Sequence, residues 1–182
     1  MPLWLSVTIL AALAVLGLWG MWHGWQARGR RTAALVPTLP AAPAVPGAPL
    51  GDAVEAVYVS STRSGDWLDR VVAHDLGVRS PARVRVHEDG VHVARTGARD
   101  VWVPSAALTA VTTSSGQAGK FVGRAELVVL TWVPDPTTGT ALDTALQVRH
   151  DDERAALLAA ARTLTAPTDT DTAPPAAQEE QA

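Results

Sequence analysis

Cysteine is absent from the 182 residues of this chain, which excludes a disulfide framework and any chemistry that needs a thiolate. Asparagine is also absent, and lysine occurs only at Lys120, so arginine carries nearly all of the positive charge. The formal net charge is −3. A chain with this balance lacks the basic surplus that binding to a nucleic-acid backbone requires. The length leaves room for one modest domain with tails.

Charged side chains are missing from residues 3–25, a run of 23 residues made mostly of Leu, Val, Ala, Ile and Trp. As a helix with a rise of ~1.5 Å per residue it would be ~34 Å long, enough to cross a hydrocarbon core of ~30 Å. Tryptophans stand at both ends of the run, where aromatic rings favour the membrane–water interface, and arginines follow it. The predicted interface residues are Trp4, Trp22, Trp25, Arg28, Arg30 and Arg31.

The position of the arginines predicts the orientation of this span. Arg28, Arg30 and Arg31 follow it, whereas only the α-amino group precedes it, so the positive-inside rule places the rest of the chain in the cytoplasm. The N-terminus would then be outside the plasma membrane. A cleaved signal peptide is the alternative, but no basic side chain precedes the run and bulky tryptophans occupy its end. The sequence therefore favours a single-pass membrane anchor.

Composition divides the remaining chain into three parts. Prolines recur every three residues from Pro37 to Pro49, which favours an extended polyproline spacer over a docking ligand. The end of the chain is polar, acidic and proline-containing, as in disordered segments. The predicted organisation is an anchor (1–27), a basic flank with a Pro-rich linker (28–51), a folded domain (52–166) and a disordered tail (167–182).

Within the domain, most segments alternate between apolar and polar residues, as half-buried strands do. In residues 82–88 the alternation places Arg83, Arg85 and His87 on one face, and Asp89-Gly90 predicts a tight hairpin. Residues 125–132 form the most continuous apolar run, which predicts a central strand. Further strands are predicted at residues 53–62, 90–96, 100–104, 107–115 and 141–148.

Two helices are predicted in the domain. Residues 64–77 have apolar side chains at helical spacing, with Ser64 as a possible cap and Gly77 as a possible end. Residues 151–164 begin with three acidic side chains, which favour a helix N-terminus. Their predicted buried stripe is Leu157, Leu158, Ala161 and Leu164.

This order predicts a mostly β fold, an antiparallel sheet or split barrel capped by a C-terminal helix, in addition to the N-terminal transmembrane helix. The segments SGDWLDRVVAHDLGVRSPARV, TGARDVWVPSAAL, GQAGK and LVVLTW, in this order, resemble a family of actinobacterial single-span membrane proteins with a pleckstrin-homology-like (PH-like) domain. The resemblance covers about residues 55–165. It implies a membrane-bound PH-like barrel, and it implies no catalytic activity.

Motifs that could carry chemistry are incomplete. The segment SSGQAGKF has Ser114 and Phe121 where a phosphate-binding loop needs glycine and a hydroxyl residue. His74 and Asp75 are neighbours on a predicted helix, so they would not face each other. His87 and His92 flank the hairpin and could lie opposite each other, but two ligands make a weak metal site and solvated histidines are favoured. The sequence predicts no catalytic residue, metal site or cofactor.

Two functions remain. The first is a non-catalytic, membrane-anchored interaction or scaffold module that presents its domain to a protein partner. The second is an accessory subunit of a transport or export complex, because one span cannot build an alternating-access path by itself. The predicted partners are the lipid bilayer, through Leu3 to Trp25, and a protein, with no nucleic acid and no small-molecule substrate. Predicted contacts to a partner or head group are Arg83, Arg85, Trp102, Gly119, Lys120 and Arg124.

Overall fold

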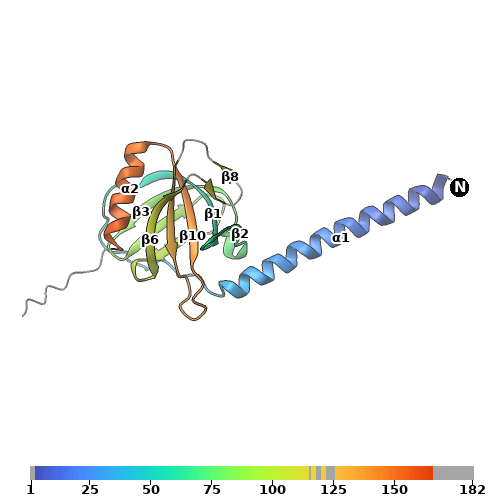
Figure 1. Cartoon of the computed structure of the whole chain (residues 1–182), viewed down its shortest axis with the longest axis horizontal. Coiled ribbons are helices and arrows are strands. Elements are labelled where there is room, and N and C mark those ends of the chain that lie inside the picture. Colours follow the sequence, from blue (N-terminus) through green and yellow to red (C-terminus); the bar gives the residue numbers. More distant parts are fainter. Residues whose placement is uncertain (1–2, 115, 118–119, 122–125, 166–182) are drawn as a thin grey trace, which may run out of the picture.

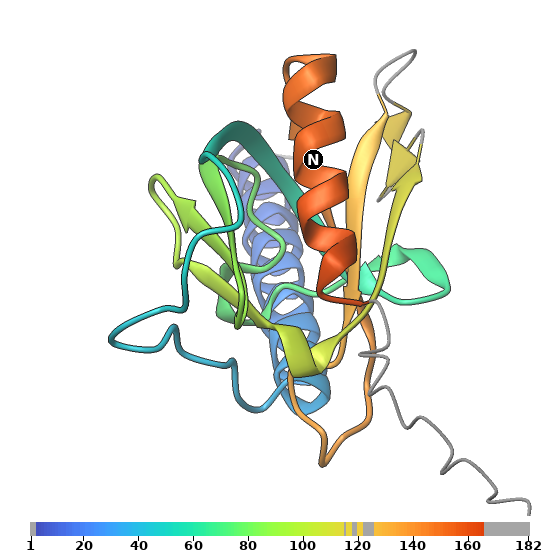
Figure 2. The same ribbon diagram turned by 90° about the vertical axis from the view of Figure 1, so that its left-hand side faces the viewer.

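The computed structural model describes residues 3–114, 116–117, 120–121 and 126–165. A curled antiparallel sheet forms a half-barrel, helix α2 packs on it, and helix α1 extends away from the domain (Figures 1 and 2). The predicted mostly β fold is confirmed. The elements are α1 (Leu3–Leu35), β1 (Val54–Arg63), β2 (Asp66–Arg70), η1 (Ala73–Asp75), β3 (Ser80–His87), β4 (Gly90–Arg95), β5 (Val101–Pro104), η2 (Ser105–Ala107), β6 (Leu108–Ser114), β7 (Gly116–Gln117), β8 (Lys120–Phe121), β9 (Leu127–Trp132), β10 (Leu142–Val148) and α2 (Asp151–Thr163).

The main sheet has the order β5-β4-β3-β1-β10-β9-β6, with β2 paired to the end of β1 and a separate β7-β8 pair. The predicted hairpin is confirmed, because His87 of β3 pairs with Gly90 of β4. The apolar run at β9 lies between β10 and β6 and is buried except at Thr131. Leu157 and Ala161 of α2 join the same core as the inward side chains of β1, β3 and β10. Burial of these faces is the main force that holds the half-barrel together.

Helix α1 confirms the helix predicted for residues 3–25 and continues without a break to Leu35. Its segment Val7–Gly24 is long and apolar enough to cross a membrane, and none of that segment is buried in the domain. Residues 26–35 are mostly alanine, arginine and glutamine, which are good helix formers, and the first proline after them is Pro37, so the helix continues to Leu35 despite Gly29. The backbone of Arg28, Arg30 and Arg31 is thus helical.

The proline-containing segment packs on the domain as a strap (residues 36–50) rather than standing free as a spacer. Val36 is fully buried, and Leu39 and Leu50 contact the core. Backbone hydrogen bonds run from Leu50 N–H to the Val86 carbonyl and from Glu88 N–H to the Ala48 carbonyl. Figure 2 shows this segment, in blue to cyan, passing along the green strands. The predicted domain start at residue 52 therefore leaves out residues that are packed against the core.

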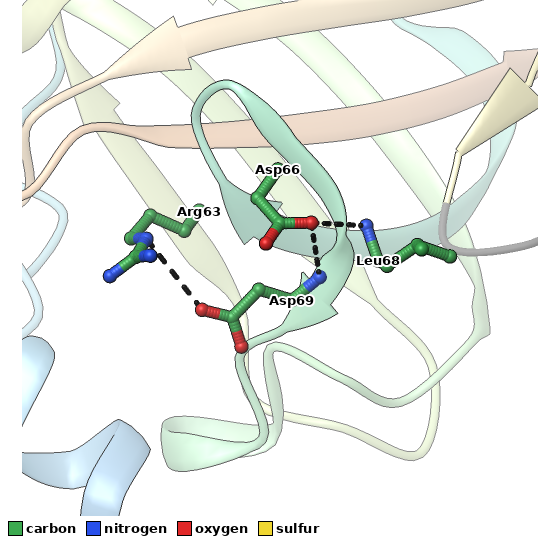
Figure 3. Close-up of polar contacts among 4 residues, drawn as sticks. All are labelled: Arg63, Asp66, Leu68 and Asp69. Carbon is green, nitrogen blue, oxygen red and sulfur yellow. Dashed lines mark hydrogen bonds and ion pairs between the residues drawn. The ribbon is translucent and has the colours of Figure 1, made fainter.

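The helix predicted at residues 64–77 is wrong. Asp66 Oδ1 accepts hydrogen bonds from the backbone N–H groups of Leu68, at 3.0 Å, and Asp69, at 3.3 Å (Figure 3). Residues 66–70 instead pair with β1, with Asp66 opposite Arg63 and Arg70 opposite Thr62, and the two hydrogen bonds lie within the bulge between these pairs. The apolar side chains that suggested one helical face are divided, because Trp67 and Leu68 are 55% and 63% exposed whereas Leu76 is buried.

A chain of polar side chains crosses the core. Trp132 Nε1 donates to Thr144 Oγ1 at 2.9 Å, which lies 2.7 Å from Ser61 Oγ. The Tyr58 hydroxyl lies 2.7 Å from Ser61 Oγ and donates to the Leu76 carbonyl oxygen at 2.9 Å. Every member of this buried chain has a partner, as the low dielectric of a core demands.

Because of Tyr58, the stability of the folded protein should decrease at alkaline pH. Burial raises its pKa to about 12, although hydrogen bonding to Ser61 and the charge of Arg95 act in the opposite direction. A tyrosine in the unfolded chain has a pKa of about 10. The preference of the folded protein for neutral Tyr58 therefore contributes its full stabilisation below about pH 10. Between about pH 10 and 12 we expect the free energy of unfolding to fall by roughly 3 kcal/mol. Urea unfolding at a series of pH values measures this.

Tyr58 is the single tyrosine of the chain, so tyrosinate absorbance reports its ionisation alone. A Tyr58→Phe variant provides the control, because its stability should decline less over the same interval. Ionisation of the folded protein at the ordinary pKa of tyrosine would contradict the prediction.

Candidate functional site

The outer face of β3, β4 and β5 carries the candidate site. Alternation along β3 turns Arg83 and Arg85 outward while Val84 is buried. Strand pairing then places Arg83 opposite Ala94 and Arg85 opposite His92, and β5 adds Trp102 opposite His92. The basic face predicted from the alternation is therefore extended by residues of two further strands.

A groove of about 490 Å³ lies over this face. The strap forms one side of it, because His87 Nδ1 lies 2.9 Å from the Gly47 carbonyl oxygen and Pro49 forms a β-bridge with His87. The groove is thus held between two parts of the chain that are far apart in sequence. Its lining residues are Pro46, Ala53, Arg83, Arg85, His87, His92 and Ala94.

The charges of the groove are only partly compensated. Arg83 Nε lies 3.7 Å from Glu55 Oε1, and both side chains are mostly exposed, so water weakens this ion pair. His92 Nε2 lies 3.6 Å from Asp100 Oδ2. Arg85 is exposed, and no described residue forms an ion pair or hydrogen bond with its side chain. The centre of the groove therefore offers a guanidinium group to an anionic partner.

Trp102 packs beside two histidines that line the groove. It is only 5% exposed. Its ring centroid lies 6.1 Å from that of His87 and 6.2 Å from that of His92, and a Cβ atom on Gly90 would lie 2.8 Å from its Cζ2. The ring therefore positions the two histidines more than it offers surface to a partner. The sequence could not show this, because the packing needs β5 beside β4.

The structure brings three of the six predicted contact residues together: Arg83, Arg85 and Trp102. Lys120 belongs to β8, where it pairs with Gln117 of β7 rather than with the strands of the groove. Gly119 and Arg124 lie outside the described residues.

The residues predicted to lie at the membrane interface all belong to α1. Trp4 and Trp22 are exposed on it, and Trp25, Arg28, Arg30 and Arg31 belong to its later turns. The predicted tail from residue 167 onward lies outside the described residues.

His87 and His92 do not lie opposite each other, because their partners across the hairpin are Gly90 and Arg85. In the part of the chain that the structure describes, no three His, Cys, Asp or Glu side chains gather as metal ligands. Sequence reasoning missed the strap as a wall of the groove. Leu39 and Leu50, apolar residues within the proline-rich segment, were the available sign that it packs on the domain.

A protein-family model described as "Bacterial PH domain-like" matches residues 36–162, which is more than half of the chain. The match begins at the first residue of the strap and ends in α2, so it includes every residue that lines the groove. No curated protein matches the chain. PH-like domains generally serve in interactions with proteins or lipids rather than in catalysis.

Proposed function

Because this chain belongs to the Bacterial PH domain-like family, we propose that it is a membrane-anchored, non-catalytic interaction module whose cytoplasmic domain binds an acidic segment of a protein partner. Anchorage is supported by Val7–Gly24, an exposed apolar stretch of α1. The exposed Trp4 and Trp22 are suited to the two interfaces of a bilayer, and three arginines after the span favour a cytoplasmic domain.

The observation that carries the binding function is the groove with the unpaired Arg85 at its centre. Arginine presents a planar fork of N–H donors that suits carboxylates. Arg83 and Arg85 lie two residues apart on one face of a strand, which separates them by about 6.6 Å along the strand. Carboxylates at alternate positions of an extended segment have the same separation, so such a segment could pair with both arginines.

The place of the groove favours a protein over a lipid head group. In Figure 1, β3 lies on the left of the domain, whereas α1 leaves the domain on the right. A cytoplasmic protein would meet the groove directly.

Site-specific photo-crosslinking tests this proposal. With a photoreactive amino acid in place of Ala94, which lines the groove, we expect a discrete adduct with a cytoplasmic protein in the membrane fraction. The double variant Arg83→Glu/Arg85→Glu should reduce the yield by about tenfold or more, because charge reversal turns attraction into repulsion.

Arg149→Glu reverses one charge outside the groove and serves as the control, since Arg149 is exposed and lies after β10. It should leave the yield unchanged. An adduct that survives the double variant would show that the groove does not hold the partner. An adduct with a multi-span membrane protein would instead favour the accessory-subunit function.

A further inference from the structure

We infer that Trp67 and Leu68 of the β1–β2 hairpin lie in the head-group layer of the membrane that α1 enters, and give the domain a second contact with lipid. This inference rests on the membrane anchorage of the proposed function. It assigns a surface outside the groove, on a different part of the sheet.

The two side chains form an exposed apolar tip. Trp67 is 55% and Leu68 is 63% exposed, whereas Val71 and Leu76 of the same segment are fully buried. Single exposed apolar residues are common, but an adjacent tryptophan and leucine on a short hairpin need a reason. Figure 3 shows Leu68 pointing away from the Arg63–Asp69 ion pair.

The tip is held in place by its own hydrogen bonds. Asp66 Oδ1 accepts from the backbone N–H groups of Leu68 and Asp69, and Arg63 Nε lies 3.6 Å from Asp69 Oδ2. These contacts fix the backbone without covering Trp67 or Leu68. The hairpin is therefore already ordered for contact, and little conformational entropy would be lost on insertion.

The tip also lies at the end of the domain where the anchor is attached. β2 leads into η1, where His74 Nε2 donates to the Val36 carbonyl oxygen at 2.9 Å, directly after the end of α1. Thr32 and Val36 are buried at this junction. In Figure 1, β2 lies on the side of the domain from which α1 extends, and Figure 3 shows the last turns of α1 near the hairpin.

The length of α1 between the membrane and the domain allows the hairpin tip to contact the head groups. Between Trp25 and Leu35, α1 rises by about 15 Å, of which the head-group layer takes about 5–7 Å. β2 folds back on β1, with Asp66 opposite Arg63 and Arg70 opposite Thr62, so Trp67, Leu68 and Asp69 form a bulge at the end of β1. A typical helix tilt of ~20° would lower one side of the domain further toward the membrane.

The chemistry fits a zwitterionic lipid surface. Tryptophan suits the membrane interface because its ring is apolar and its N–H is a donor. The basic groups Arg63 and Arg70 around the tip are matched by the acidic groups Asp66 and Asp69. Contact should thus depend on apolar burial and be insensitive to salt, unlike the attraction of a basic patch to anionic lipid.

Spin labelling tests the inference, because a chain without cysteine accepts one label at a chosen site. The full chain is placed in phosphatidylcholine nanodiscs with a nitroxide at Leu68→Cys. We expect its accessibility to oxygen relative to an aqueous nickel complex to be several-fold higher than at Asp152→Cys, an exposed site on α2. This ratio should persist at high salt and fall when Trp67→Ala is added.

A third label, at Val15→Cys within α1, separates the two possible failures. Oxygen-rich surroundings at position 15 with aqueous surroundings at position 68 would overturn the inference and leave the anchorage intact. Aqueous surroundings at position 15 would overturn the anchorage itself, and the lipid contact with it.

Discussion

Replacing Arg95 by methionine should lower the free energy of unfolding by about 3 kcal/mol, because three backbone carbonyl groups lose a charged, buried hydrogen-bond donor. Arg95 is only 7% exposed. Its guanidinium group donates to the carbonyl oxygens of Asp75 at 3.0 Å, Val78 at 2.6 Å and Arg99 at 3.1 Å. Denaturant unfolding of the variant and the parent measures the loss.

The aromatic partner of Arg95 provides a second measurement. Arg95 Cζ lies 3.8 Å from the centroid of the Tyr58 ring, and its charge lowers the pKa of that tyrosine. Burial lowers the pKa of Arg95 itself, while the charges of Tyr58, Asp75 and Asp100 oppose this. In Arg95→Met the pKa of Tyr58 should therefore rise further, which tyrosinate absorbance detects.

Two variants act as controls for this prediction. Arg95→Lys keeps the charge but loses the planar fork, so we expect an intermediate loss of stability. Arg85→Met removes an exposed arginine from the neighbouring strand and should change stability by less than about 0.5 kcal/mol. An equal loss in Arg95→Met and Arg85→Met would refute the structural role of Arg95.

The second large effect is expected for Gly90→Ala, with a loss of about 3 kcal/mol. A Cβ atom at this position would lie 2.4 Å from the Val103 carbonyl oxygen and 2.8 Å from Trp102 Cζ2. The backbone of β5 or the indole ring must move to relieve this overlap. Since Trp102 supports His87 and His92, the variant should also weaken the photo-crosslink formed from position 94.

Gly97→Ala separates overlap from backbone conformation. Gly97 has φ +78, but a Cβ atom there meets no atom within 4 Å. Gly97→Ala should therefore lower the free energy of unfolding only by the cost of placing alanine in a left-handed backbone conformation, about 1 kcal/mol. If Gly90→Ala is no more destabilising than Gly97→Ala, the close approach of β5 to Gly90 is not what the structure indicates.

The two proposals give the groove and the hairpin tip of one domain different partners. We propose that Arg85 of β3 binds an acidic protein segment and that Trp67 of β2 contacts lipid. Contact at both the anchor and the tip would restrict rotation of the domain about α1. The groove would then keep a constant orientation relative to the membrane, which favours capture of a cytoplasmic partner.

The positions of most strands along the sequence could be predicted because they depend on local patterns. The outward positions of Arg83 and Arg85 follow from a period of two, and the Asp89-Gly90 turn follows from its residue types. The helix predicted at residues 64–77 failed because residues 66–70 pair with β1 as a strand, a contact that the periodicity of the segment does not show.

The sequence by itself determined the charge-free helix, the alternating strands and the C-terminal helix, because each depends on neighbours within a few positions along the chain. Only the tertiary structure decided that the strap packs on the domain, that Arg95 is buried while Arg85 is exposed, and that Trp67 is exposed on β2, on the side of the domain from which α1 extends. These features depend on contacts between segments far apart in sequence. Periodicity shows on which face of a helix or strand a side chain lies. Only the packing of the elements shows what that face contacts.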